Sequence, residues 1–249
     1  MTGRGPIIRL ANFIIYSNAF ISAGAACFTL HTALLFPEHA GILREFSVLN
    51  FITTFVLYNL QRLYFSAQQD TGGKYNWYNR HRRLVFTLIL LLLISYSSHL
   101  LDFFSRHPHF LIGYALLALL GLLYFLPPLS LRKFGMLKPF LIAFVFVGTG
   151  ILLPLLDQLT GEVLLHAFSQ FLFIAALCVL FDVKDADHDR SLGLRTMPVI
   201  LGVTKARTLC ILLLAGFVAT GSPGSTAAFA CNLTVASTAI VFWFLAGKP

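Results

Sequence analysis

The chain has 249 residues, of which 57% are hydrophobic and 11% charged, and its formal net charge is +8. A soluble domain of this size needs more polar surface, so the composition indicates a protein whose solvent is the lipid bilayer. The four cysteines are isolated within apolar runs and form no Cys-x-x-Cys pair, which argues against a disulfide framework and a zinc site.

Eight stretches are candidate membrane spans, for which about 18 to 25 apolar residues are needed, and the seventh is shorter than this. In chain order they cover 8–36, 42–65, 83–103, 108–128, 136–156, 162–182, 207–221 and 225–246. Pro127-Pro128 ends the fourth, because proline lacks a backbone donor and clashes with the preceding turn. A turn at 222–225, "SPGS", separates the last two.

This order predicts an all-α fold, a polytopic transmembrane helix bundle of about eight spans that forms a single domain over residues 1–249. No linker or low-complexity segment interrupts it. The first apolar run continues well past "SAGAAC" at 22–27, which faintly resembles a processing site, so we expect this span to be retained.

The positive charges are unevenly distributed along this order. If both termini are cytoplasmic, sixteen of the eighteen lysines and arginines lie on the inner side, and only Arg44 and Arg106 lie outside. Correctly threaded membrane proteins show this bias. We therefore expect an integral protein of the cell inner or plasma membrane with both termini in the cytoplasm. Topology accounts for the basic charge, so neither nucleic acid nor an obligate protein partner is implied.

The stretch "FDVKDADHDR", 181–190, holds four of the ten acidic residues, at the inner end of the sixth predicted span. If the helix continues through it, Asp182, Asp185 and Asp189 share one face, at about 100° per residue, and Asp187 points elsewhere. Such carboxylates repel one another and oppose the helix dipole, whereas a divalent cation would reverse both effects. Mg²⁺ prefers one or two carboxylates together with water and phosphate oxygens. A solvated acidic loop is the alternative.

Two stretches carry a more specific pattern. "DVKDADHDRSLGLRTMPVILG", 182–202, resembles the second aspartate-rich motif of the UbiA family of intramembrane prenyltransferases. The matching residues after the three aspartates are Gly193, Thr196, Pro198 and Gly202. "LLYFLPPLSLRKFGMLKP", 122–139, is similar to the family's tyrosine-proline-basic loop between its fourth and fifth spans. Span order and orientation agree as well, so the resemblance covers most of the chain.

The resemblance implies a helix bundle around a central cavity that is open to the cytosolic side. Family members bind an isoprenyl diphosphate through Mg²⁺ at this mouth and transfer the prenyl group to an aromatic or other lipophilic acceptor. It also implies that Asp182, Asp185 and Asp189 are the metal ligands and that Asp182 and Asp185 are catalytic. Metal and basic residues would stabilise the departing diphosphate. The expected partners are the isoprenyl diphosphate, the lipophilic acceptor and membrane lipid.

The chain departs from the family pattern at the end of the second span. The family's first motif is an asparagine followed by aspartates one, four and eight positions later. In "YNLQRLYFSAQQD", 58–70, Asn59 is in place, but the acidic positions hold Leu60, Leu63 and Ala67. Asp70, three residues further on, is the nearest carboxylate.

Arg62 is the informative residue of this degenerate motif, and three roles are open for it. It could bind the diphosphate directly, since a guanidinium fork matches phosphate, which would make it catalytic. It could instead form a salt bridge with the aspartates of the sixth span. Its side chain could also extend to the lipid headgroups.

Further polar residues are candidates for diphosphate contacts, although the positive-inside bias would place the basic ones on this face anyway. The predicted substrate-binding set is Asn59, Arg62, Lys74, Lys138, Lys184 and Tyr124.

The sequence leads to the hypothesis of UbiA-type, Mg²⁺-assisted prenyl transfer. A catalytically silent isoprenoid-binding or lipid-binding relative and a prenyl diphosphate cyclase are the alternatives. A transporter is disfavoured, because the predicted spans carry no ionisable residue near the bilayer midplane.

Overall fold

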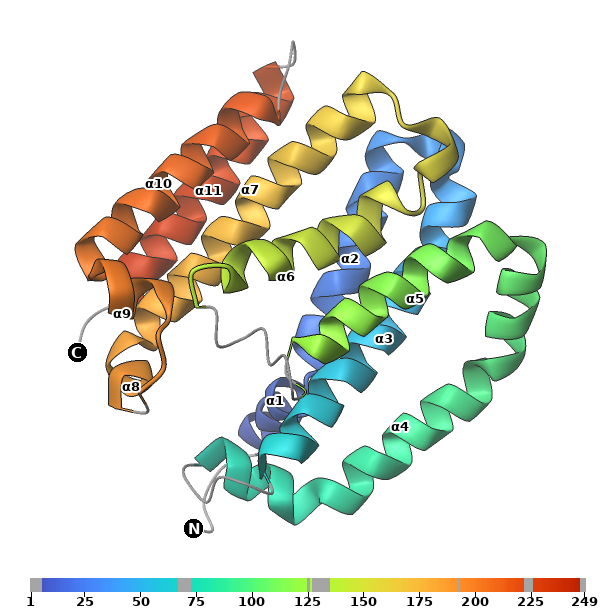
Figure 1. Cartoon of the computed structure of the whole chain (residues 1–249), viewed down its shortest axis with the longest axis horizontal. Helices are drawn as coiled ribbons and strands as arrows, with labels where there is room; N and C mark the ends of the chain where they lie inside the picture. The colour runs from blue at the N-terminus through green and yellow to red at the C-terminus, as the bar shows by residue number, and fades with distance from the viewer. Residues whose placement is uncertain are drawn as a thin grey trace. The chain divides into compact units, whose positions relative to one another are not determined.

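The computed structural model describes residues 6–66, 73–124, 126, 135–191, 193–221 and 226–246. Every regular element in these ranges is a helix and none is a strand, which confirms the all-α prediction (Figure 1). The chain divides into two compact units, Met1–Leu119 and Leu120–Pro249. The single domain over 1–249 stays a prediction.

Four helical segments are long and apolar enough to cross a membrane: Pro37–Tyr64, Trp77–Arg106, Gly161–Lys184 and Val203–Thr220. Four shorter apolar helices cover Ala19–Leu35, Pro108–Leu123, Lys138–Leu152 and Phe229–Val241. Many large apolar side chains are exposed, as on a surface that faces lipid, for example Phe86, Leu91 and Ile94. The helices show a membrane protein, while eight spans and a central cavity stay predictions.

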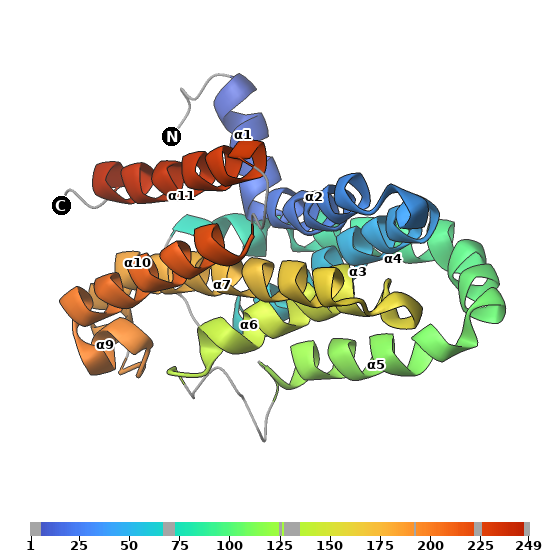
Figure 2. The same cartoon turned by 90° about the horizontal axis from the view of Figure 1, so that it is seen from above.

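The first unit contains α1 (Pro6–Tyr16), α2 (Ala19–Leu35), the short η1 (Pro37–His39), α3 (Ala40–Ser66), α4 (Gly73–Arg106) and most of α5 (Pro108–Leu123). Helices α2 and α3 lie side by side (Figures 1 and 2). The predicted first span, 8–36, is two helices rather than one. The break falls at Ser17 and Asn18, where Asn18 is left-handed with φ 62°.

A buried polar cluster links three helices of this unit. The amide nitrogen of Asn50 on α3 donates to Thr29 Oγ1 on α2 at 2.8 Å. Tyr114 on α5 donates to Thr53 Oγ1 at 2.8 Å, and its hydroxyl oxygen lies 3.2 Å from Asn50 Oδ1. Side-chain hydrogen bonds of this kind hold helices together inside a bilayer, where apolar burial distinguishes little between protein and lipid.

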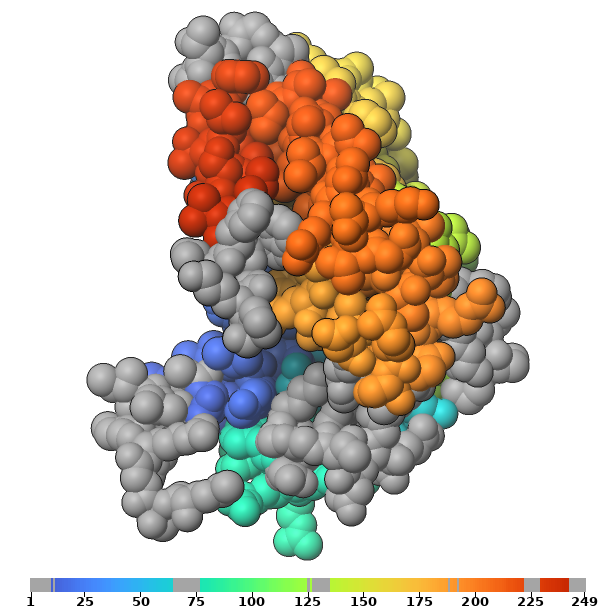
Figure 3. All heavy atoms as spheres, turned by 90° about the vertical axis from the view of Figure 1, so that its left-hand side faces the viewer, coloured from blue at the N-terminus to red at the C-terminus, as the bar shows by residue number. Residues whose placement is uncertain are grey.

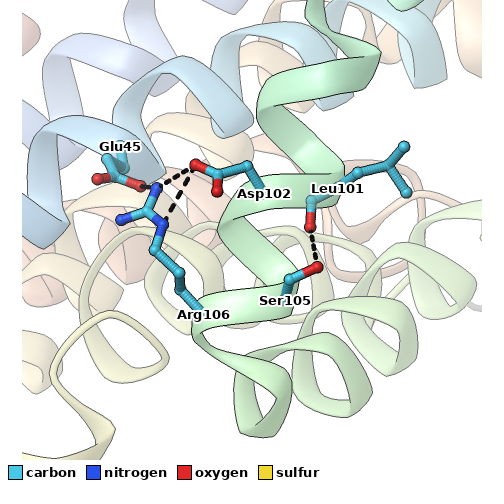
Figure 4. A network of polar contacts seen from close by, with 5 residues as sticks. All are labelled: Glu45, Leu101, Asp102, Ser105 and Arg106. Carbon is cyan, nitrogen blue, oxygen red and sulfur yellow. Dashed lines mark hydrogen bonds and ion pairs between the residues drawn. The ribbon is translucent and has the colours of Figure 1, made fainter.

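A second polar group lies at the end of α4, on the predicted outer side (Figure 4). Arg106 Nη2 lies 2.9 Å from Asp102 Oδ2 and 3.7 Å from Glu45 Oε2 on α3. Arg106 was predicted to lie on the outer side, and the first unit brings it together with Asp102 and Glu45.

The second unit begins near the end of α5 and contains α6 (Lys138–Val147), which continues as a π-helix, η3 (Gly148–Leu152). The short η4 (Leu156–Gln158) then leads to α7 (Gly161–Lys184). The elements that follow are α8 (Ala186–Ser191), α9 (Met197–Leu201), α10 (Val203–Thr220) and α11 (Thr226–Ala246).

Helix α7 is the centre of this unit, packed against α6 on one side and α10 on the other (Figure 1). The hydrophobic core of the second unit is rich in small side chains, including Ala143, Ala175, Ala176 and Ala206. Small residues let helix backbones approach closely. The atoms of α10 and α11 lie next to each other in orange and red in Figure 3.

Candidate functional site

The aspartate-rich stretch lies where α7 ends and α8 begins. Helix α7 ends at Lys184, and Asp185 follows as its C-cap with φ −93° and ψ 5°. The helix is therefore interrupted inside the stretch. The prediction that Asp182, Asp185 and Asp189 share one helix face required a continuous helix, and that helix is not formed. The cause is local, because carboxylates at a helix C-terminus oppose its dipole and favour termination.

Burial separates the four aspartates into two pairs. Asp182 is 4% and Asp189 9% exposed, whereas Asp185 and Asp187 are exposed. The exposed Asp187 pairs with Arg190 Nη1 at 3.0 Å, which agrees with its predicted place away from the others.

Asp182 is a buried aspartate with an ionic partner. Lys138, the first residue of α6, donates from Nζ to Asp182 Oδ1 in the last turn of α7. The side chains of the lysine and aspartate are 24% and 5% exposed. The other carboxylate oxygen, Oδ2, is buried and has no hydrogen-bond partner among the described residues. The structure thus joins two of the predicted site residues.

Helix α8 ends in a glycine-dependent turn that explains one motif residue. Gly193 N donates to Arg190 O at 3.1 Å and Leu194 N donates to Asp189 O at 2.9 Å. These two bonds form a Schellman motif, in which the residue after the cap is left-handed. Gly193 has φ 68°, a value that glycine adopts without strain.

Gly135 brings the two motif stretches into contact. A Cβ atom at this position would overlap the carbonyl oxygen of Arg195 and lie 2.6 Å from Thr196 Cα. Lys138 follows Gly135 by three positions, so one short segment touches the 195–196 backbone and reaches Asp182. The hydroxyl of Thr196 is buried and has no partner among the described residues.

The other predicted residues of the second unit are less involved. Lys184 is exposed at the C-terminus of α7, where a cation suits the helix dipole. Tyr124 is half-buried just after α5, and its backbone nitrogen donates to Leu120 O at 3.0 Å.

In the first unit, the side chain of Asn59 is fully buried and is used entirely within the protein. Its amide nitrogen donates to Ser17 O at 2.9 Å and Phe55 O at 2.7 Å. Its amide oxygen accepts from Asn18 at 3.1 Å and lies 3.0 Å from the hydroxyl of Tyr78. Two donors and two acceptor positions are all that an asparagine amide has. Asn59 therefore holds the α1–α2 break against α3 and α4.

Arg62 lies one turn further along α3 and donates from Nη1 to the carbonyl oxygen of Tyr16 at 2.6 Å. Tyr16 is the last residue of α1, so the guanidinium meets a helix C-terminus, where a cation is favourable. This contact was not among the three predicted roles, which stay predictions. Lys74 belongs to α4 but its side chain is outside the described part, and Asp70 lies outside the described residues.

Within the described ranges, no three His, Cys, Asp or Glu side chains are grouped closely enough to hold a metal ion. The Mg²⁺ site at Asp182, Asp185 and Asp189 stays a prediction.

Sequence reasoning missed two residues, Tyr78 and Gly135, and one pairing between predicted residues, Lys138 with Asp182. Tyr78 carries no motif, and its hydroxyl becomes informative only because it lies 2.9 Å from Asn59 O. Gly135 and the pairing of Lys138 with Asp182 are contacts between distant segments, although the match at 122–139 drew attention to the stretch that contains both residues.

These features describe a helical membrane protein with a partly buried lysine–carboxylate pair at one end of α7, the central helix of the second unit. Its sequence is similar to that of chloroplastic chlorophyll synthases. It is 28% identical to the Avena sativa protein over 120 residues, which are 45% of this chain and 31% of that protein. It is 25% identical to the Oryza sativa subsp. japonica protein over 165 residues, which are 60% of this chain and 43% of that protein.

Each match thus spans less than half the length of the relative. No family profile and no solved structure matches the chain. At this low identity, the similarity supports the resemblance to the UbiA prenyltransferase superfamily.

Proposed function

We propose that this protein is a UbiA-type prenyltransferase that transfers the prenyl group of an isoprenyl diphosphate to an aromatic or other lipophilic acceptor within the membrane. The observation that carries the proposal is the partly buried Lys138–Asp182 pair, whose second carboxylate oxygen is buried and has no partner among the described residues. It lies in the two stretches that resemble the family. Taking charged groups out of water at the end of a predicted span is costly, and such groups are commonly functional. The low-identity similarity to chlorophyll synthases supports the same class of reaction.

In the proposed reaction, the bond between the allylic carbon and the diphosphate oxygen breaks, and both electrons leave with the diphosphate. A nucleophilic atom of the acceptor bonds to the allylic carbon and then loses a proton to solvent or to the released diphosphate. The role of this chain is to bind the diphosphate with fixed positive charge, because such charge stabilises the leaving group as it departs.

Mg²⁺ belongs to this proposal, with Asp182, Asp185 and Asp189 as candidate ligands. The side chains do not form a closed protein cage, but one or two carboxylates suffice for Mg²⁺ when phosphate oxygens and water complete its shell. When bound, the ion would neutralise charge on the diphosphate. Arg62, Asn59, Lys74, Lys184 and Tyr124 stay predicted diphosphate contacts.

A second candidate is a family relative that binds an isoprenoid or another lipid without turnover. The hydrogen bonds of Asn59 favour this second candidate. All the hydrogen-bonding positions of its side-chain amide are occupied within the protein, so the amide would have to break internal bonds to contact a ligand. Cyclisation of a prenyl diphosphate would use the same leaving-group chemistry without an acceptor.

The test is pyrophosphate release by purified protein from prenyl diphosphates of several chain lengths, with Mg²⁺ and candidate acceptors. The enzyme should release pyrophosphate, and Asp182→Asn and Asp185→Asn should each lower the rate by about tenfold or more, as expected for loss of a charged group that acts on the leaving group. Asp187→Asn, at the exposed bystander, is the matched control. Absence of release with every donor, or equal rates in all variants, would remove the catalytic proposal.

A further inference from the structure

Lys138 and Asp182 lie at helix ends that do not suit their charges. Lys138 is the first residue of α6, where the helix dipole already provides positive potential. Asp182 is in the last turn of α7, where the dipole provides negative potential. Neither position stabilises its own helix, so local helix stability does not explain why these charges are there.

The pair is also incomplete as a structural salt bridge. A buried ion pair compensates for desolvation only when the remaining lone pairs and protons are also satisfied. Asp182 Oδ2 is buried and unpartnered among the described residues, while the side chain of Lys138 is 24% exposed. The lysine therefore retains donors that a ligand can reach, and the aspartate is the more deeply buried partner.

The position of Lys138 is constrained from two directions. Pro139 follows it at the second position of α6, which fixes the backbone φ there. Gly135, three residues before it, lies directly against the backbone of Arg195 and Thr196. An ammonium held in this way is preorganised, and a preorganised cation binds an anion without paying again for ordering its chain.

We propose that Lys138 is the resident cation of the diphosphate site and that Asp182 is a positioning residue that acts through Lys138 rather than as a metal ligand. The inference rests on the proposed function for the identity of the anion. It leaves Asp185 and Asp189 as the candidate ligands for Mg²⁺. It further implies that part of the affinity for diphosphate does not depend on a metal.

The experiment measures binding of inorganic pyrophosphate to the full-length protein in detergent by calorimetry, once in EDTA and once with Mg²⁺. The wild type should bind in EDTA. Lys138→Met should weaken this binding by about tenfold or more, the usual loss for a charge-assisted hydrogen bond, and Lys138→Arg should restore part of it. Lys205→Met, which removes an exposed lysine on α10, is the matched control and should bind like the wild type.

Asp182→Asn separates a positioning residue from a metal ligand. If Asp182 acts through Lys138, the effect of Asp182→Asn on pyrophosphate affinity should disappear in the Lys138→Met background. In the single variant Asp182→Asn, the Mg²⁺ concentration for half-maximal binding should stay as in the wild type. If Lys138→Met alone does not fold, the double variant Lys138→Met/Asp182→Asn takes its place, since it leaves no unpaired buried charge. In EDTA, that double variant should bind pyrophosphate about tenfold or more weaker than the wild type, as expected for Lys138→Met.

Three results would overturn the inference: pyrophosphate binding by the wild type that requires Mg²⁺, unchanged binding by Lys138→Met, or a several-fold higher Mg²⁺ requirement in Asp182→Asn. Turnover of prenyl diphosphates is measured separately. Absence of turnover with intact, Lys138-dependent pyrophosphate binding would reject the proposed reaction and leave this assignment standing.

Discussion

At the scale of single residues, Asn59 carries the most concentrated set of contacts in the first unit. Its side chain joins Ser17 and Asn18 at the α1–α2 break to Tyr78 on α4. All of these groups are buried. Truncation of Asn59 would leave several polar partners without hydrogen bonds in a place that water does not reach.

Asn59→Ala should therefore lower the free energy of unfolding by about 1–3 kcal/mol, the cost of leaving buried partners unsatisfied. Thermal unfolding in detergent measures the effect. Asn79→Ala, at an exposed asparagine of α4, is the control and should leave the melting temperature unchanged. Equal melting temperatures for both variants would show that the buried network adds nothing to stability.

Gly135 lies so close to another backbone segment that only glycine fits at this position. Gly135→Ala should lower stability by about 1–3 kcal/mol, because the added methyl group must displace the backbone of Arg195 and Thr196. It should also weaken pyrophosphate binding in EDTA, since Lys138 is positioned by the same segment. Gly24→Ala, at a helical glycine with open space around it, is the control and should be neutral or slightly stabilising. A stable Gly135→Ala protein with wild-type binding would contradict this account.

At the scale of elements, buried and exposed polar contacts between helices contribute differently to stability. The buried clusters around Asn50 and Asn59 connect helices where water does not compete. The Arg106–Asp102–Glu45 group joins α3 and α4 with exposed side chains (Figure 4). Exposed ion pairs contribute little, because solvent screens them and ordering long side chains costs entropy.

Arg106→Gln should accordingly leave the melting temperature close to that of the wild type, at both low and high salt. Thermal unfolding of the two proteins in parallel at two ionic strengths is the measurement. A drop as large as that of Asn59→Ala would show that this group holds α3 and α4 together.

At the scale of the whole molecule, the number of spans decides where each loop lies. Four helices are long enough to cross by length and composition, and four apolar helices are shorter. If all eight cross, Glu38, His107 and Gln158 are on the outer side and the N-terminus is inside. If only the four long ones cross, Glu38 and the N-terminus lie on the same side.

We expect eight crossings, because this places most of the basic residues inside. In a variant without native cysteines, Glu38→Cys, His107→Cys and Gln158→Cys should react with an impermeant thiol reagent on intact cells. Lys205→Cys and an epitope tag at the N-terminus should become accessible only after permeabilisation. Accessibility of Glu38→Cys and the N-terminal tag from the same side would exclude a crossing by α2.

Composition and the length of the apolar stretches were sufficient for the all-helical fold, because apolar stretches of this length have no stable alternative to helix in lipid. The positions of most helices followed from the same stretches. The break at Asn18 did not, since a buried asparagine is tolerated there only because Asn59 bonds to it. The interruption at Asp185 was also not predicted, although the unfavourable effect of the carboxylates on the end of α7 is local.

The sequence by itself determined the membrane class, the helical elements and the two stretches that hold the candidate site. Tertiary structure alone decided which residues meet: Lys138 with Asp182 and Gly135 with the 195–196 backbone in those stretches, and Asn59 with Tyr78 elsewhere in the chain. The physical reason is that apolar length is a local property of the chain, readable from one segment at a time. A charge or hydrogen-bond pairing depends on two distant segments being packed together, and no single segment specifies its partner.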